Sequence, residues 1–175
     1  MKDVTTTYPG NIGSMPGSSD AIIVGLISDT HGLLRSSVHE ALKGVSLILH
    51  AGDVGGEEIL EELRMIAPVR AVYGNTDPVG DPSLVQEIVI SLGNLEAHVS
   101  HGHELGSPTP ENLLSSYPHD VIIYGHTHRQ MITRAEGRLV VNPGAAGPRR
   151  FNLSPSVARL TVRGDKAEVE IVPID

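Results

Sequence analysis

The chain has no cysteine and no tryptophan among its 175 residues, and its remaining aromatic residues are four Tyr and one Phe. The absence of cysteine excludes disulfide bonds, thiolate metal sites and cysteine nucleophiles. With so few aromatic side chains, the core must consist of Val, Ile, Leu and Ala, as in the buried sheets of α/β proteins. Any catalytic or metal-binding chemistry is therefore left to residue types other than cysteine.

Long apolar runs are missing as well. No stretch approaches the roughly 18 apolar residues of a membrane span, and the first 20 residues lack the apolar segment of a signal peptide. We therefore predict a cytoplasmic protein with no membrane partner. The net charge of -8 argues against a stable nucleic-acid complex, because such affinity comes mostly from neutralised phosphates. A small phosphoester substrate is still compatible with this charge, since a bound metal reverses the charge locally.

The domain organisation is simple. The length fits one domain of ordinary size. Residues 1–20 are rich in Gly, Pro, Ser and Thr and show no periodicity, which predicts a flexible N-terminal tail. Residues 21–175 are expected to form one folded domain.

Apolar runs alternate with helical patterns, which predicts an α/β fold. Buried strands are predicted over 21–28, 46–50, 69–73 and 120–124. Helices are predicted from a cap at Ser36 or Ser37 to Gly44, over 57–66, and over 110–116 with Thr109 as cap. A hairpin turns at Gly93-Asn94 between 85–92 and 95–100, and four more strands are predicted over 130–134, 138–141, 156–163 and 166–172. The βαβαβ start and a mainly antiparallel remainder predict two sheets packed face to face with helices outside.

Polar residues follow the strands at the point where each strand ends. The five segments are Asp29-Thr30-His31, Gly52-Asp53, Gly74-Asn75, His101-Gly102-His103 and Gly125-His126-Thr127-His128. Ligands of open α/β sheets bind at this edge. Each segment alone is common in turns and caps. Chance does not account for five strand ends that carry such residues together.

The residue types indicate the kind of site. Carboxylates, imidazoles and an amide oxygen suit Mn, Fe, Zn, Co or Ni better than Ca or a structural zinc. The candidate ligands are too many for one four-coordinate ion and fit two ions about 3.5–4 Å apart that share a carboxylate. We expect two divalent ions, with Mn²⁺ first among them. The seven predicted ligands are Asp29, His31, Asp53, Asn75, His101, His126 and His128.

With these motifs, residues 22–150 resemble the calcineurin-like metallophosphoesterase superfamily, and in particular its small bacterial and archaeal phosphodiesterases. The resemblance implies a four-layer αββα sandwich of two mixed β-sheets flanked by helices. It implies that Asp29, His31 and His128 bind one ion, and that Asp53 bridges both ions. It also implies that Asn75, His101 and His126 complete the coordination of the second ion.

One departure from the superfamily concerns the proton donor. Many members have a histidine directly after the Asn, where this chain has Thr76. We name His103 as the candidate general acid, or else a residue that hydrogen-bonds to the ligands, and count Asn75 with it as catalytic. Asp77 is expected to orient Asn75 or a neighbouring backbone group. Arg149, after the Asn-Pro-Gly turn at 142–144, either holds a substrate phosphate or is an ordinary exposed arginine.

The function predicted first is hydrolysis of a phosphodiester by a metal-bridging hydroxide, with a monoester as the weaker option. The alternative is a non-catalytic protein-interaction scaffold on the same fold. The retromer subunit of this superfamily resembles such a case. A third option is a mononuclear hydrolase that uses His126, His128 and one Asp. The edge strands, rich in Val and Ile, are compatible with a homodimer.

Overall fold

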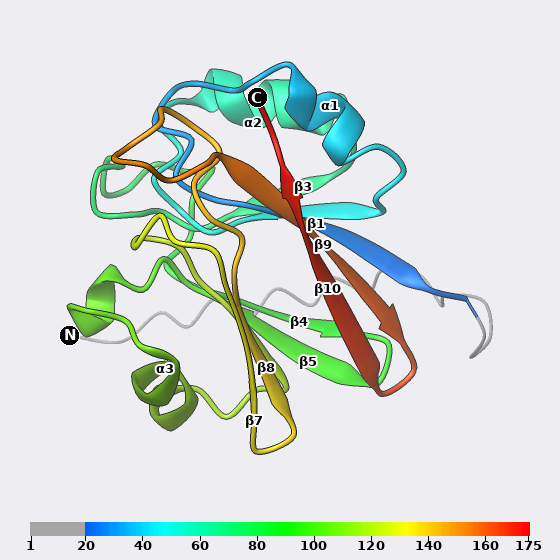
Figure 1. Ribbon diagram of the computed structural model, residues 1–175. Helices are drawn as coiled ribbons and strands as arrows, with labels where there is room; N and C mark the ends of the chain where they lie inside the picture. Colours follow the sequence, from blue (N-terminus) through cyan, green and yellow to red (C-terminus); the bar gives the residue numbers. More distant parts are fainter. Residues whose placement is uncertain (1–19) are drawn as a thin grey trace.

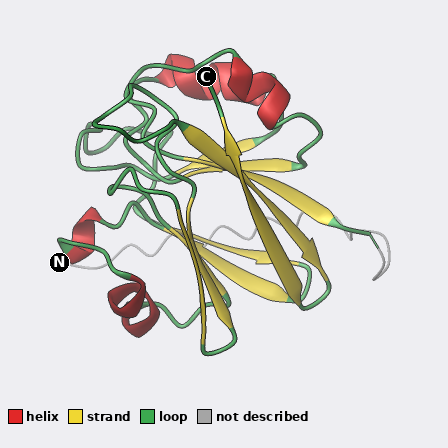
Figure 2. Cartoon of the chain, in the orientation of Figure 1, coloured by secondary structure: helices red, strands yellow, loops and turns green. Residues whose placement is uncertain are grey.

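The structure is a computed structural model that describes residues 20–175. The predicted tail over 1–20 therefore lies, apart from Asp20, outside the described residues. Two five-stranded sheets pack face to face, with the orders β10-β9-β1-β2-β3 and β4-β5-β6-β8-β7. Helices lie on the outside of this pair, and the chain forms the predicted four-layer αββα sandwich (Figure 1, Figure 2).

The first sheet contains the predicted βαβαβ unit. Strands β1 (Ile22–Ile27), β2 (Leu47–His50) and β3 (Val69–Ala71) are parallel, and helices α1 (Ser37–Ala41) and α2 (Glu57–Arg64) connect them. Strands β9 (Ser156–Arg163) and β10 (Lys166–Pro173) complete this sheet as an antiparallel pair beside β1. The carboxyl ends of β1, β2 and β3 consequently lie along one edge of the sheet.

The second sheet is mixed. The hairpin β4 (Ile88–Leu92) and β5 (Leu95–Val99) is antiparallel, as predicted, and so is the pair β7 (Met131–Ala135) and β8 (Arg138–Asn142). Strand β6 (Val121–Ile123), however, runs parallel to both β5 and β8. The 3₁₀ turn η1 (His103–Leu105) and α3 (Pro110–Ser116) form the connection from β5 to β6. The remainder is therefore mainly antiparallel, as predicted, and the parallel pairings of β6 make the second sheet mixed.

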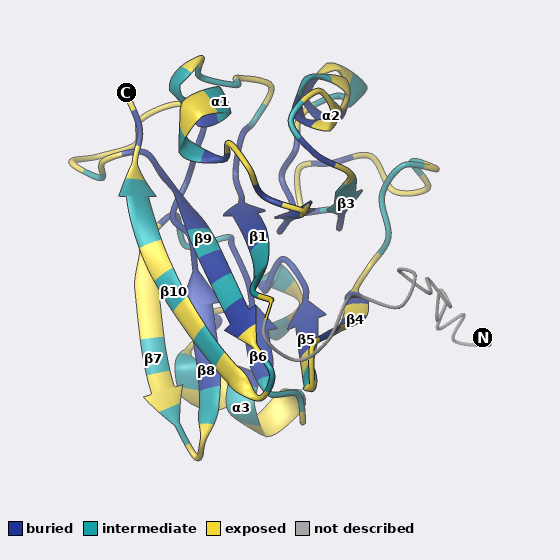
Figure 3. Cartoon of the chain, turned by 90° about the vertical axis from the view of Figure 1, so that its right-hand side faces the viewer, coloured by how far each residue is buried: buried dark blue, intermediate teal, exposed yellow. Residues whose placement is uncertain are grey.

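Successive side chains of each strand point to opposite faces of its sheet, and this alternation divides the core into layers. Leu47 and Leu49 of β2 face the second sheet, whereas Ile48 between them faces α1 and α2. A smaller cluster around Leu113 and Tyr124 packs α3 against the outer face of the second sheet. The central strands are buried along most of their length, while β7 and β10 at the open edges carry exposed side chains (Figure 3).

Helix ends show where local prediction succeeds and fails. Thr109 caps α3, because its side-chain oxygen accepts a hydrogen bond from the Asn112 N–H. Ser36 precedes α1 as expected, but its backbone is already α-helical and its side chain makes no capping bond. Helix α1 ends at Ala41 rather than near Gly44. Within residues 20–175, none of the helices has the length and apolarity that crossing a bilayer requires.

Candidate metal centre

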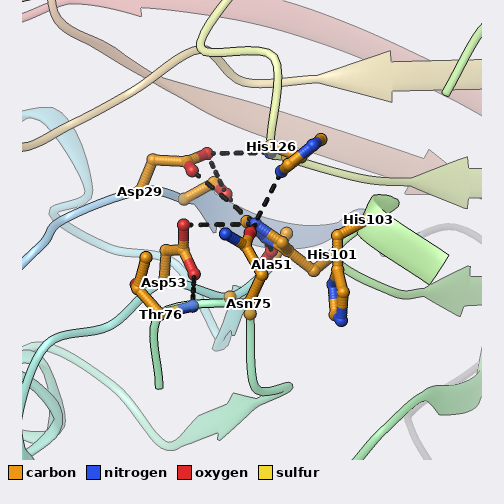
Figure 4. Close-up of polar contacts among 12 residues, drawn as sticks. Asp29, Ala51, Asp53, Asn75, Thr76, His101, His103 and His126 are labelled. Carbon is orange, nitrogen blue, oxygen red and sulfur yellow. Dashed lines mark hydrogen bonds and ion pairs between the residues drawn. The ribbon is translucent and has the colours of Figure 1, made fainter. Parts of the chain in front are cut away.

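The carboxyl ends of five strands from the two sheets meet at one end of the sandwich. The segments after β1, β2 and β3 come from the first sheet, and those after β5 and β6 from the second. Their loops gather on one side in Figure 1, and the side chains converge between the sheets (Figure 4). The structure brings all seven predicted ligands into this group through the contacts described below.

The first group of side chains consists of Asp29, His31 and His128. Asp29 Oδ1 lies 3.2 Å from His128 Nε2 and 3.9 Å from His31 Nε2. The two imidazole Nε2 atoms are 3.3 Å apart. One carboxylate oxygen and two imidazole nitrogens thus point at a common space, as ligands of one ion must.

The second group lies beside the first and contains an amide oxygen. His101 Nε2 is 3.1 Å from Asn75 Oδ1 and 3.3 Å from Asp53 Oδ2. His126 Nδ1 is 3.1 Å from the same Asn75 oxygen. Asp53 Oδ2 also lies 3.7 Å from His31 Nε2, so this oxygen stands between the two groups.

Both aspartates are near His101, and their distances differ. The Asp29, Asp53 and His101 ligand atoms lie within 4.8 Å of one another. His101 Nε2 is 3.3 Å from Asp53 Oδ2 but 4.0 Å from Asp29 Oδ1. Asp53 is therefore the better placed of the two carboxylates to be shared.

An orphaned oxygen shows that these residues fit a cation. Asp29 is completely buried, and its Oδ2 accepts hydrogen bonds from Ser28 Oγ at 2.7 Å and from the His126 N–H at 3.2 Å. Within residues 20–175, Asp29 Oδ1 accepts no hydrogen bond, and imidazole nitrogens are its polar neighbours. A buried carboxylate oxygen without a donor is costly. The imidazole nitrogens around this oxygen make a divalent ion the natural partner for it.

Carboxylates and imidazoles also shift one another's pKa values. Burial lowers the pKa of His101, but the carboxylates of Asp53 and Asp29 outweigh it and raise this pKa above its usual range. Burial raises the pKa of Asp53, but the hydrogen bond to His101 and those from Thr76 hold this pKa well below its usual range. Asp53 is therefore ionised at neutral pH and ready to bind a cation.

Hydrogen bonds outside the group orient the ligands. His101 Nδ1 donates to the Ala51 carbonyl oxygen at 2.7 Å, which fixes the ring so that Nε2 faces Asp53 and Asn75. The Thr76 N–H donates to Asp53 Oδ1 at 2.9 Å. Thr76, at the position where many superfamily members have histidine, thus holds the oxygen of Asp53 that faces away from the imidazoles.

The ligand loops are unusually tight. Five of the seven candidate ligands have a positive φ of 46–69°, namely Asp29, His31, Asp53, His126 and His128. Non-glycine residues seldom adopt this left-handed region. Two glycines leave room for the carboxylates, because a Cβ at Gly74 would lie 2.0 Å from Asp53 Oδ1 and one at Gly125 2.8 Å from Asp29 Oδ2.

Asp77 supports two of these loops. Its carboxylate accepts hydrogen bonds from the Gly74 N–H at 2.8 Å, the Gly55 N–H at 3.0 Å and the Val54 N–H at 3.1 Å. The prediction that Asp77 orients a neighbouring backbone group is confirmed. Because the three amides flank Asp53 and Asn75, Asp77 ties the loop after β2 to the loop after β3.

Sequence reasoning missed His50. This last residue of β2 is fully buried, and its Nε2 lies 2.9 Å from Thr30 Oγ1. The Thr30 hydroxyl donates to the Val54 carbonyl oxygen at 2.8 Å, and the Gly52 N–H donates to His50 Nδ1 at 3.2 Å. His50 thereby joins the first two ligand loops. The only signal in the sequence is a histidine at the end of an apolar strand.

The other two predicted residues lie at the rim. The His103 ring is 5.3 Å from the His101 ring and 6.3 Å from the His126 ring, and it stands at the edge of the group (Figure 4). Arg149 lines a small hollow next to His128. Both are close enough to the candidate ligands to act on a bound molecule, and their roles stay predictions.

Fold and site together define the class of the protein. Residues 22–165 match the family model for the calcineurin-like phosphoesterase superfamily domain, and the chain belongs to this superfamily. The predicted family and the predicted class, a metal-dependent phosphoesterase, are both confirmed.

The chain is similar in sequence to two archaeal proteins and in fold to a solved vacuolar sorting protein, among others. It is 33% identical over 159 residues to a "Probable metallophosphoesterase" of Methanothermobacter thermautotrophicus, which covers 86% of this chain and 92% of that protein. It is 27% identical over 139 residues to the "Phosphodiesterase MJ0936" of Methanocaldococcus jannaschii, over 69% of this chain and 82% of that protein. The structure of Vacuolar Protein Sorting 29 from Cryptosporidium parvum has the same fold, with a TM-score of 0.75, 23% identity, and coverage of 89% of this chain and 98% of that chain.

Proposed function

We propose that the protein hydrolyses phosphodiesters with the help of two divalent metal ions. The observation that carries this proposal is the pair of adjoining ligand groups with Asp53 Oδ2 between them and the orphaned Asp29 Oδ1 beside it. The name of the archaeal phosphodiesterase that resembles this chain supports the same substrate class.

We assign Asp29, His31 and His128 to the first ion and Asn75, His101 and His126 to the second, with Asp53 shared. Every assigned donor atom is within 4 Å of another donor of its own group. When bound, such ions polarise the phosphoryl oxygens and lower the pKa of a water molecule so that hydroxide is available as the nucleophile. Among the described residues, the two carboxylates of the site balance only half of the ions' charge, so the site attracts phosphate in an acidic protein.

Residues of the chain itself hold the metal ligands in position and supply a proton donor. His101 is held by the Ala51 carbonyl oxygen, and Asp53 is held by Thr76, so neither ligand has to reorient when a cation arrives. His103 lies beside His101 and is our proposed proton donor to the leaving group. With Thr76 where a histidine commonly stands, diesters with good leaving groups should be the better substrates.

Hydrolysis of bis-p-nitrophenyl phosphate and p-nitrophenyl phosphate tests the proposal. We expect turnover that Mn²⁺ stimulates and EDTA abolishes, with the diester preferred, and Fe²⁺, Zn²⁺, Co²⁺ and Ni²⁺ assayed in parallel. The Asp53→Asn variant should fall to the rate without metal, whereas Asp165→Asn, in the exposed turn after β9, should keep the full rate. Absence of metal-stimulated hydrolysis of either ester would refute the proposal.

Metal counting separates two ions from one. Elemental analysis of the Mn²⁺-saturated protein should give two ions per chain, and about one in Asp53→Asn. A saturated wild-type protein with one ion would favour the mononuclear alternative.

The role of His103 has its own test. A general acid contributes about 10²–10⁴-fold when the leaving group is poor, and much less when it is p-nitrophenolate. His103→Asn should therefore slow an alkyl phosphodiester far more than bis-p-nitrophenyl phosphate. An equal loss on both substrates would mean that His103 supports the ligands instead.

The scaffold alternative rests on the fold shared with Vacuolar Protein Sorting 29. Every one of the seven ligand positions in this chain holds a residue that can bind metal, which favours the enzyme. If Asp53→Asn abolished hydrolysis but left the protein's biological role intact, the scaffold would be the better account.

A further inference from the structure

Glu104 is a partly buried carboxylate next to the candidate proton donor. It follows His103 in the 3₁₀ turn η1, and its side chain is 26% exposed. Its Oε2 accepts a hydrogen bond from the Gly102 N–H at 2.9 Å, and its Oε1 accepts one from the Tyr117 hydroxyl at 2.8 Å. Oε2 also lies 3.7 Å from His103 Nδ1. One carboxylate therefore contacts both the His103 ring and the glycine that separates His103 from the candidate ligand His101.

Glu104 carries its negative charge at neutral pH. Burial raises the pKa of this carboxyl, but polar neighbours, among them Ser100, Tyr117 and the Gly102 N–H, outweigh burial and lower the pKa below its usual range. The Tyr117 hydroxyl keeps its proton, because burial and the adjacent Glu104 raise the pKa of this tyrosine to about 12. The hydrogen bond between Tyr117 and Glu104 is thus one from a neutral hydroxyl to a charged oxygen, which is stronger than a bond between neutral groups.

Tyr117 is itself firmly held on the outer face of the second sheet. Its ring stacks on that of His98 in β5, with ring centroids 3.8 Å apart and an interplanar angle of 22°. His98 Nε2 lies 2.9 Å from Glu87 Oε2. The Tyr117 carbonyl oxygen accepts a hydrogen bond from Arg138 Nη1 at 2.7 Å. Glu104 is therefore attached through Tyr117 to the strands of the sheet as well as to its own turn.

The buried nitrogen of the His103 ring has no hydrogen bond in this structure. Within residues 20–175, His103 Nδ1 is buried and has no hydrogen-bond partner. Its 3.7 Å separation from Glu104 Oε2 is longer than a hydrogen bond. Catalytic hydrogen bonds are often long in the free enzyme and shorten when the substrate is bound. Because a buried polar atom without a partner is costly, the Glu104 carboxylate is the natural acceptor for Nδ1.

We propose that Glu104 is a positioning residue for His103. Its carboxylate fixes the Gly102 backbone and holds the His103 ring with Nδ1 towards Oε2, which makes Nε2 the nitrogen available to the leaving group. This inference rests on the proposed function, with His103 as the proton donor, and adds the group that orients this donor.

Two diesters with different leaving groups test the proposal. Bis-p-nitrophenyl phosphate needs little help from a general acid, whereas the phenolate of diphenyl phosphate is a poorer leaving group and needs a proton. Glu104→Gln keeps the shape of the side chain but removes its charge. With Mn²⁺ present, it should lower kcat/KM for diphenyl phosphate at least about tenfold more than for bis-p-nitrophenyl phosphate. Tyr117→Phe removes one hydrogen bond to the carboxylate and keeps the stacked ring, so it should change this ratio in the same direction by a smaller factor.

Two controls separate this role from a general support of the turn. Glu111→Gln makes the same chemical change at an exposed position of α3 and should leave the ratio unchanged. Mn²⁺ affinity, measured by calorimetry, should be the same in Glu104→Gln as in the wild type, because the Ala51 carbonyl oxygen holds His101 independently.

A double variant shows whether Glu104 acts through His103. In the His103→Asn background, Glu104→Gln should have no further effect on the ratio of the two kcat/KM values. Additive effects, an equal loss on both esters, or a wild type that hydrolyses only bis-p-nitrophenyl phosphate would overturn the inference while metal-dependent diester hydrolysis still stood. No metal-stimulated hydrolysis by the wild type would overturn the proposed function as well.

Discussion

The buried histidine beneath the ligand loops should make the fold sensitive to acid. The Thr30 hydroxyl donates its proton to the Val54 carbonyl oxygen, so it accepts a hydrogen bond from His50 Nε2. His50 Nδ1 in turn accepts a hydrogen bond from the Gly52 N–H. Protonation of Nδ1 would break the bond to Gly52 and place a charge in the core. Burial accordingly lowers the pKa of His50 to about 4.

The sign and size of the effect follow from linkage. The unfolded chain binds the proton near pH 6.5 and the folded chain near pH 4, so the unfolded state holds the extra proton between these values. Stability is therefore full above pH 6.5 and falls as the pH drops towards 4. The whole shift corresponds to about 3 kcal/mol, of which about 2 kcal/mol is lost between pH 6.5 and pH 4.5.

Urea unfolding followed by circular dichroism, in EDTA, measures this loss. His50→Gln cannot titrate, so it should lose about 2 kcal/mol less than the wild type between pH 6.5 and pH 4.5. Thr30→Val is the matched control, because it removes a hydrogen-bond partner at every pH but keeps the imidazole. It should be less stable throughout and retain the pH dependence. If wild type and His50→Gln lose the same free energy of unfolding over this interval, His50 is not the buried neutral group described here.

Three further variants test the supports of the site. Asp77→Asn should lower the free energy of unfolding by about 1–3 kcal/mol, since three backbone amides lose a charged acceptor; an unchanged urea midpoint would contradict this. Gly125→Ala places a methyl group 2.0 Å from a buried serine oxygen, so its Mn²⁺ affinity, measured by calorimetry, should fall at least about tenfold. The control Gly137→Ala, with open space around the added methyl group, should bind Mn²⁺ normally. Thr76→Val removes a hydroxyl that helps to lower the pKa of Asp53, and it should weaken Mn²⁺ binding up to about tenfold. Unaltered affinity would show that the backbone N–H of Thr76 suffices.

Much of the fold could be predicted because its signals are local. The hairpin β4–β5 follows from apolar alternation on both sides of Gly93-Asn94, and it forms with the expected turn. The convergence of the ligand side chains follows from geometry alone, since parallel strands end at one edge. The sheet to which a late strand belongs has no local signal, and β9 and β10 join β1 across more than 130 residues of chain.

Contacts between loops were harder to predict than the loops themselves. Asp77 accepts hydrogen bonds from the Val54 and Gly55 amides, which lie more than 20 residues away in the sequence. His50 bonds to the Thr30 hydroxyl, which lies 20 residues away. Neither residue type nor spacing indicates such partners. The positive φ of the candidate ligands was equally hidden, because most aspartates and histidines have negative φ, although both types enter the left-handed region more often than other non-glycine residues.

The left-handed ligands have a consequence for the evolution of this fold. Each of the five candidate ligands with positive φ costs conformational energy that glycine would not, and that asparagine tolerates better than most residues. Random drift that replaces a ligand by Gly or Asn would therefore relieve strain while it destroys the ion site. Only selection for activity opposes this drift, since selection for stability alone favours it. A descendant that no longer needs the chemistry can lose its ions and become a more robust protein, free to be used for other purposes.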